Sequence, residues 1–182
     1  MDADLSTEVL FIGGRAGVGK STVGAEVSHL LASAEVQHAL IEGDNLDQAY
    51  PEPWRAGIDL AEQNLAAMWK NYRKAGYRRL IFTNTVSVLQ IEPLIAALGG
   101  RVRSTGVLLI ASDESARSRL AVREIGSGLD EHVQRSAAAA RKLAAEAGPA
   151  IHRVVTDGRT VNQIARDLIA LTGWPDTQNG SM

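Results

Sequence analysis

The stretch Gly13-Gly14-Arg15-Ala16-Gly17-Val18-Gly19-Lys20-Ser21 decides the fold of this chain. From Gly14 onward it matches the pattern G-x-x-x-x-G-K-[ST] at every fixed position, which is the pattern of a phosphate-binding loop. An apolar run at 9–12 precedes the loop, as a buried strand would, and apolar residues follow it at helical spacing. This context favours phosphate binding over the alternative, a glycine-rich turn that only joins two elements.

The residue types of the loop explain how it would hold a nucleotide. Glycines let successive backbone N–H groups turn inward around a phosphate because no Cβ is in the way. The first turn of the following helix adds unpaired N–H groups and the positive end of its dipole. Lys20 is expected to reach the β- and γ-phosphates, and the Ser21 hydroxyl to ligate Mg²⁺. The expected nucleotide-binding residues here are Gly14, Arg15, Ala16, Gly17, Val18, Gly19, Lys20, Ser21 and Thr22.

Composition indicates an ordinary globular protein. Of the 182 residues, 45% are hydrophobic and 22% charged, and the net charge of −2 gives no reason to expect a nucleic acid or a membrane surface as partner. The absence of cysteine excludes disulfides, thiolate catalysis and cysteine-ligated metals. No apolar stretch approaches the ~20 residues that span a bilayer, and basic residues of a signal peptide are missing, so we expect a cytoplasmic protein, either monomer or homodimer.

Apolar patterns predict strands that alternate with helices. The expected strands are 9–12, 36–41, 80–82, 107–111 and 151–156, and helices are expected after the phosphate loop and at 58–75, 87–98, 113–124, 131–147 and 161–172. This alternation implies an α/β fold with a parallel sheet covered on both faces. We expect one domain over 1–174 and a disordered tail over 175–182. Ligands of such sheets bind at the carboxyl ends of the strands.

Carboxylates follow the second expected strand, near where a γ-phosphate would lie. Glu42 and Asp44 flank a glycine there, and Asp44 is the favoured functional residue. Its carboxylate would accept a proton from an attacking hydroxyl or hold a water molecule of bound Mg²⁺, and the sequence leaves both roles open. The alternative is a plain turn or helix cap. No strand ends in a Walker B aspartate, so a metal would rest on Ser21, the phosphates and Asp44 or Glu42.

Arginines precede a glycine-containing connection at 125–128. Arg119 and Arg123 lie four residues apart, hence on one helical face, where they would suit a lid of about 114–136 that closes over transferring phosphate. The alternative is a solvated helix face. Arg135 follows closely enough to be a second clamp. The polar residues expected to face water here are His132, Arg135 and Arg141.

Two further groups are open to more than one interpretation. Asp157 and Arg159 flank a glycine after the fifth expected strand, where they would meet a nucleotide base or form a simple turn. Trp54, Trp69 and Tyr72 would line an acceptor pocket, although the helical spacing of the last two favours the core. The four histidines lack metal-ligand spacing, so no zinc site is expected.

With these motifs the chain resembles the small P-loop kinases, the nucleoside-monophosphate-kinase-like group that includes adenylyl-sulfate, gluconate, chloramphenicol and shikimate kinases. The segments that carry the resemblance are the phosphate loop, Glu42-Gly43-Asp44-Asn45-Leu46, Arg119-Leu120-x-x-Arg123-Glu124 and Asp157-Gly158-Arg159. The resemblance implies a three-layer fold around a five-stranded parallel sheet, with a small helical lid between the fourth and fifth strands. It implies ATP and Mg²⁺ as cofactors, phosphorylation of a small molecule's hydroxyl, Asp44 as base or metal-water ligand, and Arg123 as lid residue.

The chain departs from these relatives at two positions. Glu42 replaces the first aspartate of the Asp-Gly-Asp motif of adenylyl-sulfate and gluconate kinases, and Asp47 stands where the former carry an arginine. An acidic group there would repel a sulfate or phosphate, and with Asn84, Thr85 and the tryptophans nearby it suggests a polar, hydroxylated or cationic acceptor.

Two classes of function remain open: an ATP-dependent kinase, or a nucleotide-binding regulatory switch with weak NTPase activity, which the missing Walker B aspartate would suit. The chain also lacks the Asn-Lys-x-Asp segment that reads guanine, so ATP is expected over GTP.

Overall fold

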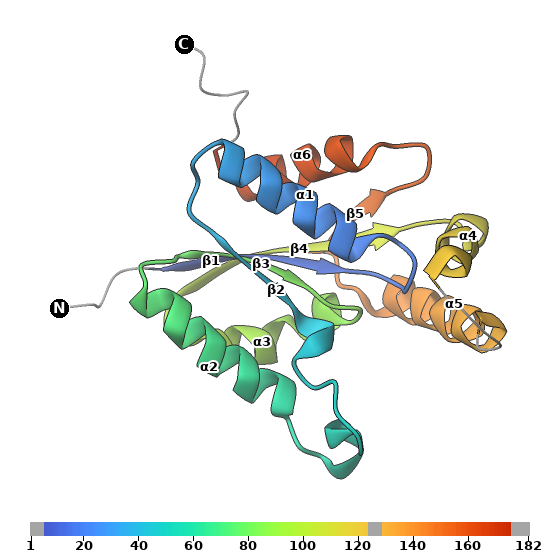
Figure 1. Ribbon diagram of the computed structural model, residues 1–182, viewed down its shortest axis with the longest axis horizontal. Coiled ribbons are helices and arrows are strands. Elements are labelled where there is room, and N and C mark those ends of the chain that lie inside the picture. Colours follow the sequence, from blue (N-terminus) through green and yellow to red (C-terminus); the bar gives the residue numbers. More distant parts are fainter. Residues whose placement is uncertain (1–5, 124–128, 176–182) are drawn as a thin grey trace.

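The centre of the molecule is a five-stranded parallel sheet (Figure 1). A computed structural model describes residues 6–123 and 129–175. The strands are β1 (Thr7–Gly13), β2 (Ala39–Glu42), β3 (Arg79–Thr83), β4 (Val102–Ile110) and β5 (His152–Val155). Their order is β2-β3-β1-β4-β5, and every neighbouring pair is parallel. The predicted parallel α/β sheet is confirmed.

Helices cover both faces of the sheet, which gives the three layers visible in Figure 1. One face is covered by α1 (Lys20–Ser33) and α6 (Val161–Thr172), and the other by α2 (Leu60–Lys74), α3 (Ile91–Leu98) and α5 (Leu129–Glu146). The remaining helix, α4 (Asp113–Arg123), follows β4 at the carboxyl end of the sheet. Among the described residues, no helix has the length and apolar character needed to cross a membrane.

Side chains of β1 point alternately to the two faces of the sheet, which explains the unbroken apolar run at 9–12. Leu10 and Ile12 belong to the core under α1 and α6, whereas Val9 and Phe11 belong to the core under α2 and α3. A parallel strand buried on both faces is expected to read in this way. Trp69 of α2 is fully buried in the second core, which confirms its predicted core position, and its indole donates to Thr7 Oγ1 at 3.1 Å.

Several predicted boundaries were wrong for identifiable reasons. The second strand begins at Ala39 and not at 36, because the Val36 amide donates to Leu31 O at 2.9 Å and closes the end of α1. The fourth strand begins at Val102, five residues before the predicted start at 107. Its added residues pair with β1, although they are partly exposed and mostly polar. The single helix expected at 87–98 is divided into a short 3-10 helix at Ser87–Leu89 and α3.

The order of the strands places the phosphate loop. β1 lies in the middle of the sheet, the chain moves from it to β2 and β3 on one side, and β4 and β5 lie on the other. Ligands of open parallel sheets bind at such a switch point, outside the carboxyl ends of the strands. The segments that follow β1, β2, β3 and β4 all emerge at this edge, which brings the candidate residues together.

Candidate active site

The phosphate loop presents an open space before the first turn of α1. Gly19 precedes α1 with φ +103°, a left-handed conformation that glycine adopts readily, and a Cβ added there would meet no atom within 4 Å. A glycine at this position offers no side-chain cap, so the first N–H groups of α1 are left for a ligand. Lys20 is buried against the loop, and its Nζ donates to Arg15 O at 3.3 Å.

A hollow in front of this loop, here called the loop hollow, brings most of the predicted catalytic residues together. Lys20, Ser21 and Asp44 all line it, although Asp44 comes from a different strand end. His132, which was expected to face water, is half-buried and also lines the loop hollow. The complete lining is Ala16, Gly17, Gly19, Lys20, Ser21, Asp44, Thr85, Leu120 and His132.

The carboxylates after β2 lie in different positions relative to Ser21. Ser21 Oγ donates to Glu42 Oε2 at 3.0 Å, whereas the Asp44 carboxylate accepts from the Thr85 amide at 3.2 Å. A serine hydroxyl and a carboxylate are suitable oxygen ligands for Mg²⁺. Among the described residues, no group of three or more His, Cys, Asp or Glu side chains would form a metal cage. A metal here would therefore depend on the phosphates of a nucleotide, as Mg²⁺ does in kinases.

The side chain of Arg15 turns away from the loop hollow. It is buried, it pairs with Asp113 of α4, and its Nε donates to Ser136 Oγ of α5 at 2.8 Å. Ser136 Oγ in turn donates to Ala16 O at 2.8 Å. Only the backbone of Arg15 is therefore placed for a phosphate. No pattern in the sequence indicated this link, because Arg15 and Ser136 are 121 residues apart.

Helix α4 lies directly on the phosphate loop. Gly17 has φ +79°, and a Cβ there would lie 2.6 Å from Ala116 O, so only glycine allows the helix to approach this closely. Arg119 Nη1 donates to Val18 O at 3.0 Å and to Thr156 Oγ1 at 3.3 Å. The predicted lid segment is thus in contact with the loop.

A second hollow, here called the arginine hollow, lies on the other side of the loop. Arg119 and Arg159 both line it, together with Thr22 and apolar side chains of α1 and α6. Arg159 Nη2 also pairs with Asp167 at 2.6 Å. The complete lining is Gly17, Val18, Gly19, Thr22, Val23, Arg119, Val122, Thr156, Arg159, Val161 and Ile164.

Asp157 does not line the arginine hollow. Its carboxylate accepts from the Ser112 amide at 2.7 Å and so joins the end of β5 to the start of α4. The Ser115 hydroxyl, the Ser112 amide and hydroxyl, and the charge of Arg119 lower the pKa of Asp157 below its ordinary value. Its predicted contact with a nucleotide stays a prediction. The side chain of Arg123 lies outside the described part of the structure, as do residues 124–128, so its lid role also stays a prediction.

A third hollow, here called the acidic hollow, adjoins the loop hollow, and Asp44 and Thr85 line both. Its volume of about 500 Å³ falls within the roughly 300–1,000 Å³ that is typical of small-molecule sites. Of the candidate aromatic residues, only Trp54 lines it. The complete lining is Asp44, Asp47, Trp54, Ile58, Asp59, Leu60, Ala61, Glu62, Asn84, Thr85, Val86 and Gln90.

Comparison with solved structures gives the fold a family context. No protein-family model and no curated protein matches the chain. The tunicamycin resistance protein of Deinococcus radiodurans has a TM-score of 0.65 and 19% identity, over 93% of this chain and 98% of that one. A gluconokinase of Sinorhizobium meliloti 1021 has a TM-score of 0.57 and 21% identity, over 94% of this chain and 93% of that one.

The APS kinase of Mycobacterium tuberculosis, solved with AMPPNP and APS, gives a TM-score of 0.54 and 18% identity, over 93% of this chain and 99% of that one. At these identities the likeness shows the fold, which is that of the small P-loop kinases. The predicted resemblance is confirmed at that level.

Proposed function

We propose that this protein is an ATP- and Mg²⁺-dependent kinase that transfers the γ-phosphate to a hydroxyl group of a small molecule. The observation that carries the proposal is that neighbouring hollows share lining residues. The arginine and loop hollows share Gly17 and Gly19, and the loop and acidic hollows share Asp44 and Thr85. A base, a triphosphate and an acceptor would occupy them in that order.

The nucleotide would lie along the phosphate loop. Its base would enter the arginine hollow, between the two arginine side chains and the apolar residues Val23 and Ile164. Its phosphates would accept from the loop N–H groups and from Lys20, whose ammonium already lies over the loop. Arg123 is proposed to offset charge on the transferring phosphate.

Mg²⁺ would be held by Ser21, by the phosphates and, directly or through water, by Glu42. The hydrogen bond from Ser21 to Glu42 supports this assignment, and we therefore propose Glu42 for the metal role that the sequence had left open between Glu42 and Asp44. When bound, the ion neutralises charge on the β- and γ-phosphates.

Asp44 would act as the general base of the transfer. Its carboxylate borders both the loop hollow and the acidic hollow, and the Thr85 amide orients it. The carboxylate takes the proton of the acceptor hydroxyl as the acceptor oxygen forms its bond to the γ-phosphorus. The bond from that phosphorus to the β–γ bridging oxygen breaks, and ADP leaves with the electron pair.

A regulatory switch is the second candidate. It is favoured by the contacts of α4 and α5 with the phosphate loop, because a nucleotide that binds the loop would change the surroundings of both helices. A switch would hydrolyse ATP slowly with no stimulation by a small acceptor.

The phosphate loop itself is tested by Lys20→Ala. Because the ammonium contacts phosphate, its loss is expected to weaken MgATP binding by about 2–3 kcal/mol, or roughly 30- to 150-fold in Kd, with the thermal unfolding transition retained. Calorimetric titration with MgATP measures the effect, and MgGTP in the same assay should bind more weakly to the wild type. Unchanged MgATP affinity in the variant would show that the loop does not hold the phosphates.

A further inference from the structure

The acidic hollow carries a strong excess of one charge. Among the described residues that line it, none is lysine, arginine or histidine. Its acidic residues come from two separate segments, the loop after β2 and the beginning of α2. They are Asp44, Asp47, Asp59 and Glu62.

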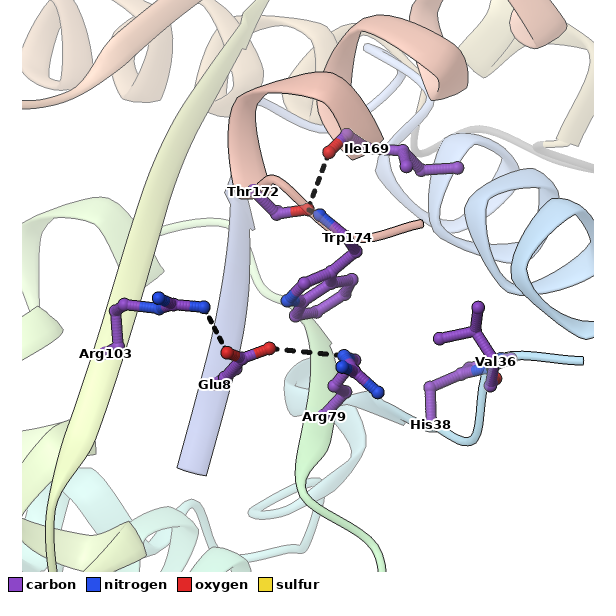
Figure 2. A network of polar contacts seen from close by, with 8 residues as sticks. All are labelled: Glu8, Val36, His38, Arg79, Arg103, Ile169, Thr172 and Trp174. Atoms are coloured by element: carbon purple, nitrogen blue, oxygen red, sulfur yellow. Dashed lines mark hydrogen bonds and ion pairs between the residues drawn. The ribbon is translucent and has the colours of Figure 1, made fainter. Parts of the chain in front are cut away.

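Three of these carboxylates lack an internal partner. Within the described parts of the chain, the side-chain carboxylates of Asp47, Asp59 and Glu62 form no ion pair and accept no hydrogen bond, and the Asp59 side chain precedes α2 without capping it. At the other end of the sheet the arrangement is the opposite. Figure 2 shows Glu8 held between Arg79 and Arg103. The protein thus neutralises a carboxylate there but gathers unneutralised ones around the acidic hollow.

This charge decides which acceptors the hollow would favour. Four carboxylates around one concave surface create a negative potential that low-dielectric walls concentrate. Sugar acids, sulfates and phosphates would be repelled, whereas a protonated amine would gain an attractive contact at each carboxylate that it approaches.

An exposed aromatic ring completes the hollow. Trp54 is 55% exposed and lies on the short 3-10 helix Pro53–Ala56, and it lines the hollow together with Asn84 and Thr85. An indole face suits both a sugar-like ring and a cation. The amide and hydroxyl groups of Asn84, Thr85 and Gln90 suit hydroxyl groups.

We infer that the acceptor is a polyhydroxylated molecule that carries one or more protonated amines. The inference rests on the proposed kinase function and names the substrate class of that site. The hydroxyl that receives phosphate lies beside Asp44, which borders the loop hollow, and the amines lie toward Asp47 and Asp59.

Trp54 provides a direct readout of binding. The chain has three tryptophans, and Trp69 and Trp174 are 0% and 5% exposed, so a ligand in the acidic hollow would change chiefly the emission of Trp54. The full chain is titrated with three polyols that differ in charge: kanamycin, a polyamine; maltotriose, which is neutral; and lactobionate, an anion. Trp54→Phe is expected to remove the fluorescence change, with calorimetry as the second measure of binding.

Kanamycin is expected to bind at least about tenfold more tightly than maltotriose, and lactobionate more weakly still. The double variant Asp47→Asn/Asp59→Asn is expected to weaken kanamycin binding about tenfold and to leave maltotriose unchanged. The matched control Glu92→Gln/Glu146→Gln removes two exposed carboxylates elsewhere and should change neither affinity. Equal affinity for kanamycin and lactobionate, kanamycin binding unaffected by the double variant, or no kanamycin binding would each overturn the inference.

The same polyols separate this inference from the kinase proposal. If an anionic or neutral polyol stimulates ADP release from MgATP more than kanamycin does, the kinase function stands and the inference about charge falls. If kanamycin binds as expected but no polyol receives phosphate, the inference about the hollow stands and the kinase function loses its support.

Discussion

At the scale of single residues, the proposed function gives different tasks to Glu42, the last residue of β2, and to Asp44, which follows it. Glu42 accepts the hydrogen bond of Ser21 and so lies beside the expected metal position. Asp44 lies farther along the chain, is exposed, and borders the hollow proposed for the acceptor. The sequence favoured Asp44 because it follows the second strand at the carboxyl edge of the sheet and matches the second aspartate of the Asp-Gly-Asp motif, whereas Glu42 replaces the first.

This division predicts different defects for two nearly isosteric variants. Asp44→Asn is expected to lower kcat by roughly 10²–10⁴, because an amide is a poor base, with little change in the affinity for MgATP. Glu42→Gln is expected chiefly to raise the Mg²⁺ concentration that half-saturates the rate. Both are measured as ADP release in single turnover at varied Mg²⁺. If Glu42→Gln loses the rate at saturating Mg²⁺ while Asp44→Asn keeps it, the two assignments are reversed.

Candidate site residues could be recognised from the sequence where they lie close together in the chain. The phosphate loop was recognisable because the groups expected to contact phosphate come from one short segment with fixed spacing. His132 was not, because its place depends on how α5 packs. One signal was available: His132 and Ser136 lie four residues apart, hence on one face of the helix, and Ser136 bonds the loop.

At the scale of elements, α4 and α5 are joined to the phosphate loop by a buried link. Arg15 pairs with Asp113 at the beginning of α4 and donates to Ser136 of α5. One guanidinium nitrogen, Nη2, is buried with no hydrogen-bond partner among the described residues, so the link is not fully satisfied. The expectation that the lid segment 114–136 closes over a bound nucleotide stays a prediction.

Arg15→Met tests the link. The variant is expected to lower the free energy of unfolding by about 1–3 kcal/mol, since it removes the buried hydrogen bond from Arg15 to Ser136. The side chain of Asp113 is 81% exposed, so water solvates its carboxylate when the pair is lost. Amide hydrogen exchange in α4 should become faster, and MgATP should slow it in the wild type more than in the variant. Arg117→Met is the matched control, because Arg117 forms an exposed ion pair with Asp130 whose loss should change stability by less than about 1 kcal/mol. Equal effects of the two variants in urea unfolding would mean that the buried link has no special role.

At the scale of the whole molecule, the order of strands and helices was predictable, whereas the acidic hollow was not. A chain in which continuous apolar strands alternate with helices can adopt only a few topologies. The phosphate loop after the first strand indicates which of these topologies applies. The acidic hollow is built largely from irregular segments between β2 and α2 and after β3, which have no periodicity from which their course follows. Trp54 and Asp59 become neighbours of Asn84 only in three dimensions.

The proposed phosphoryl transfer rests on the lining residues that the three hollows share, because nucleotide binding alone would need no acceptor hollow beside the phosphate loop. The most direct test supplies ATP labelled in the γ-phosphate, Mg²⁺ and kanamycin to the wild type, to Lys20→Ala and to Asp44→Asn, and separates the labelled products. The account predicts a labelled polyol with the wild type and almost none with either variant. Label recovered only as inorganic phosphate, at the same rate with and without any polyol of the charge series, would contradict it.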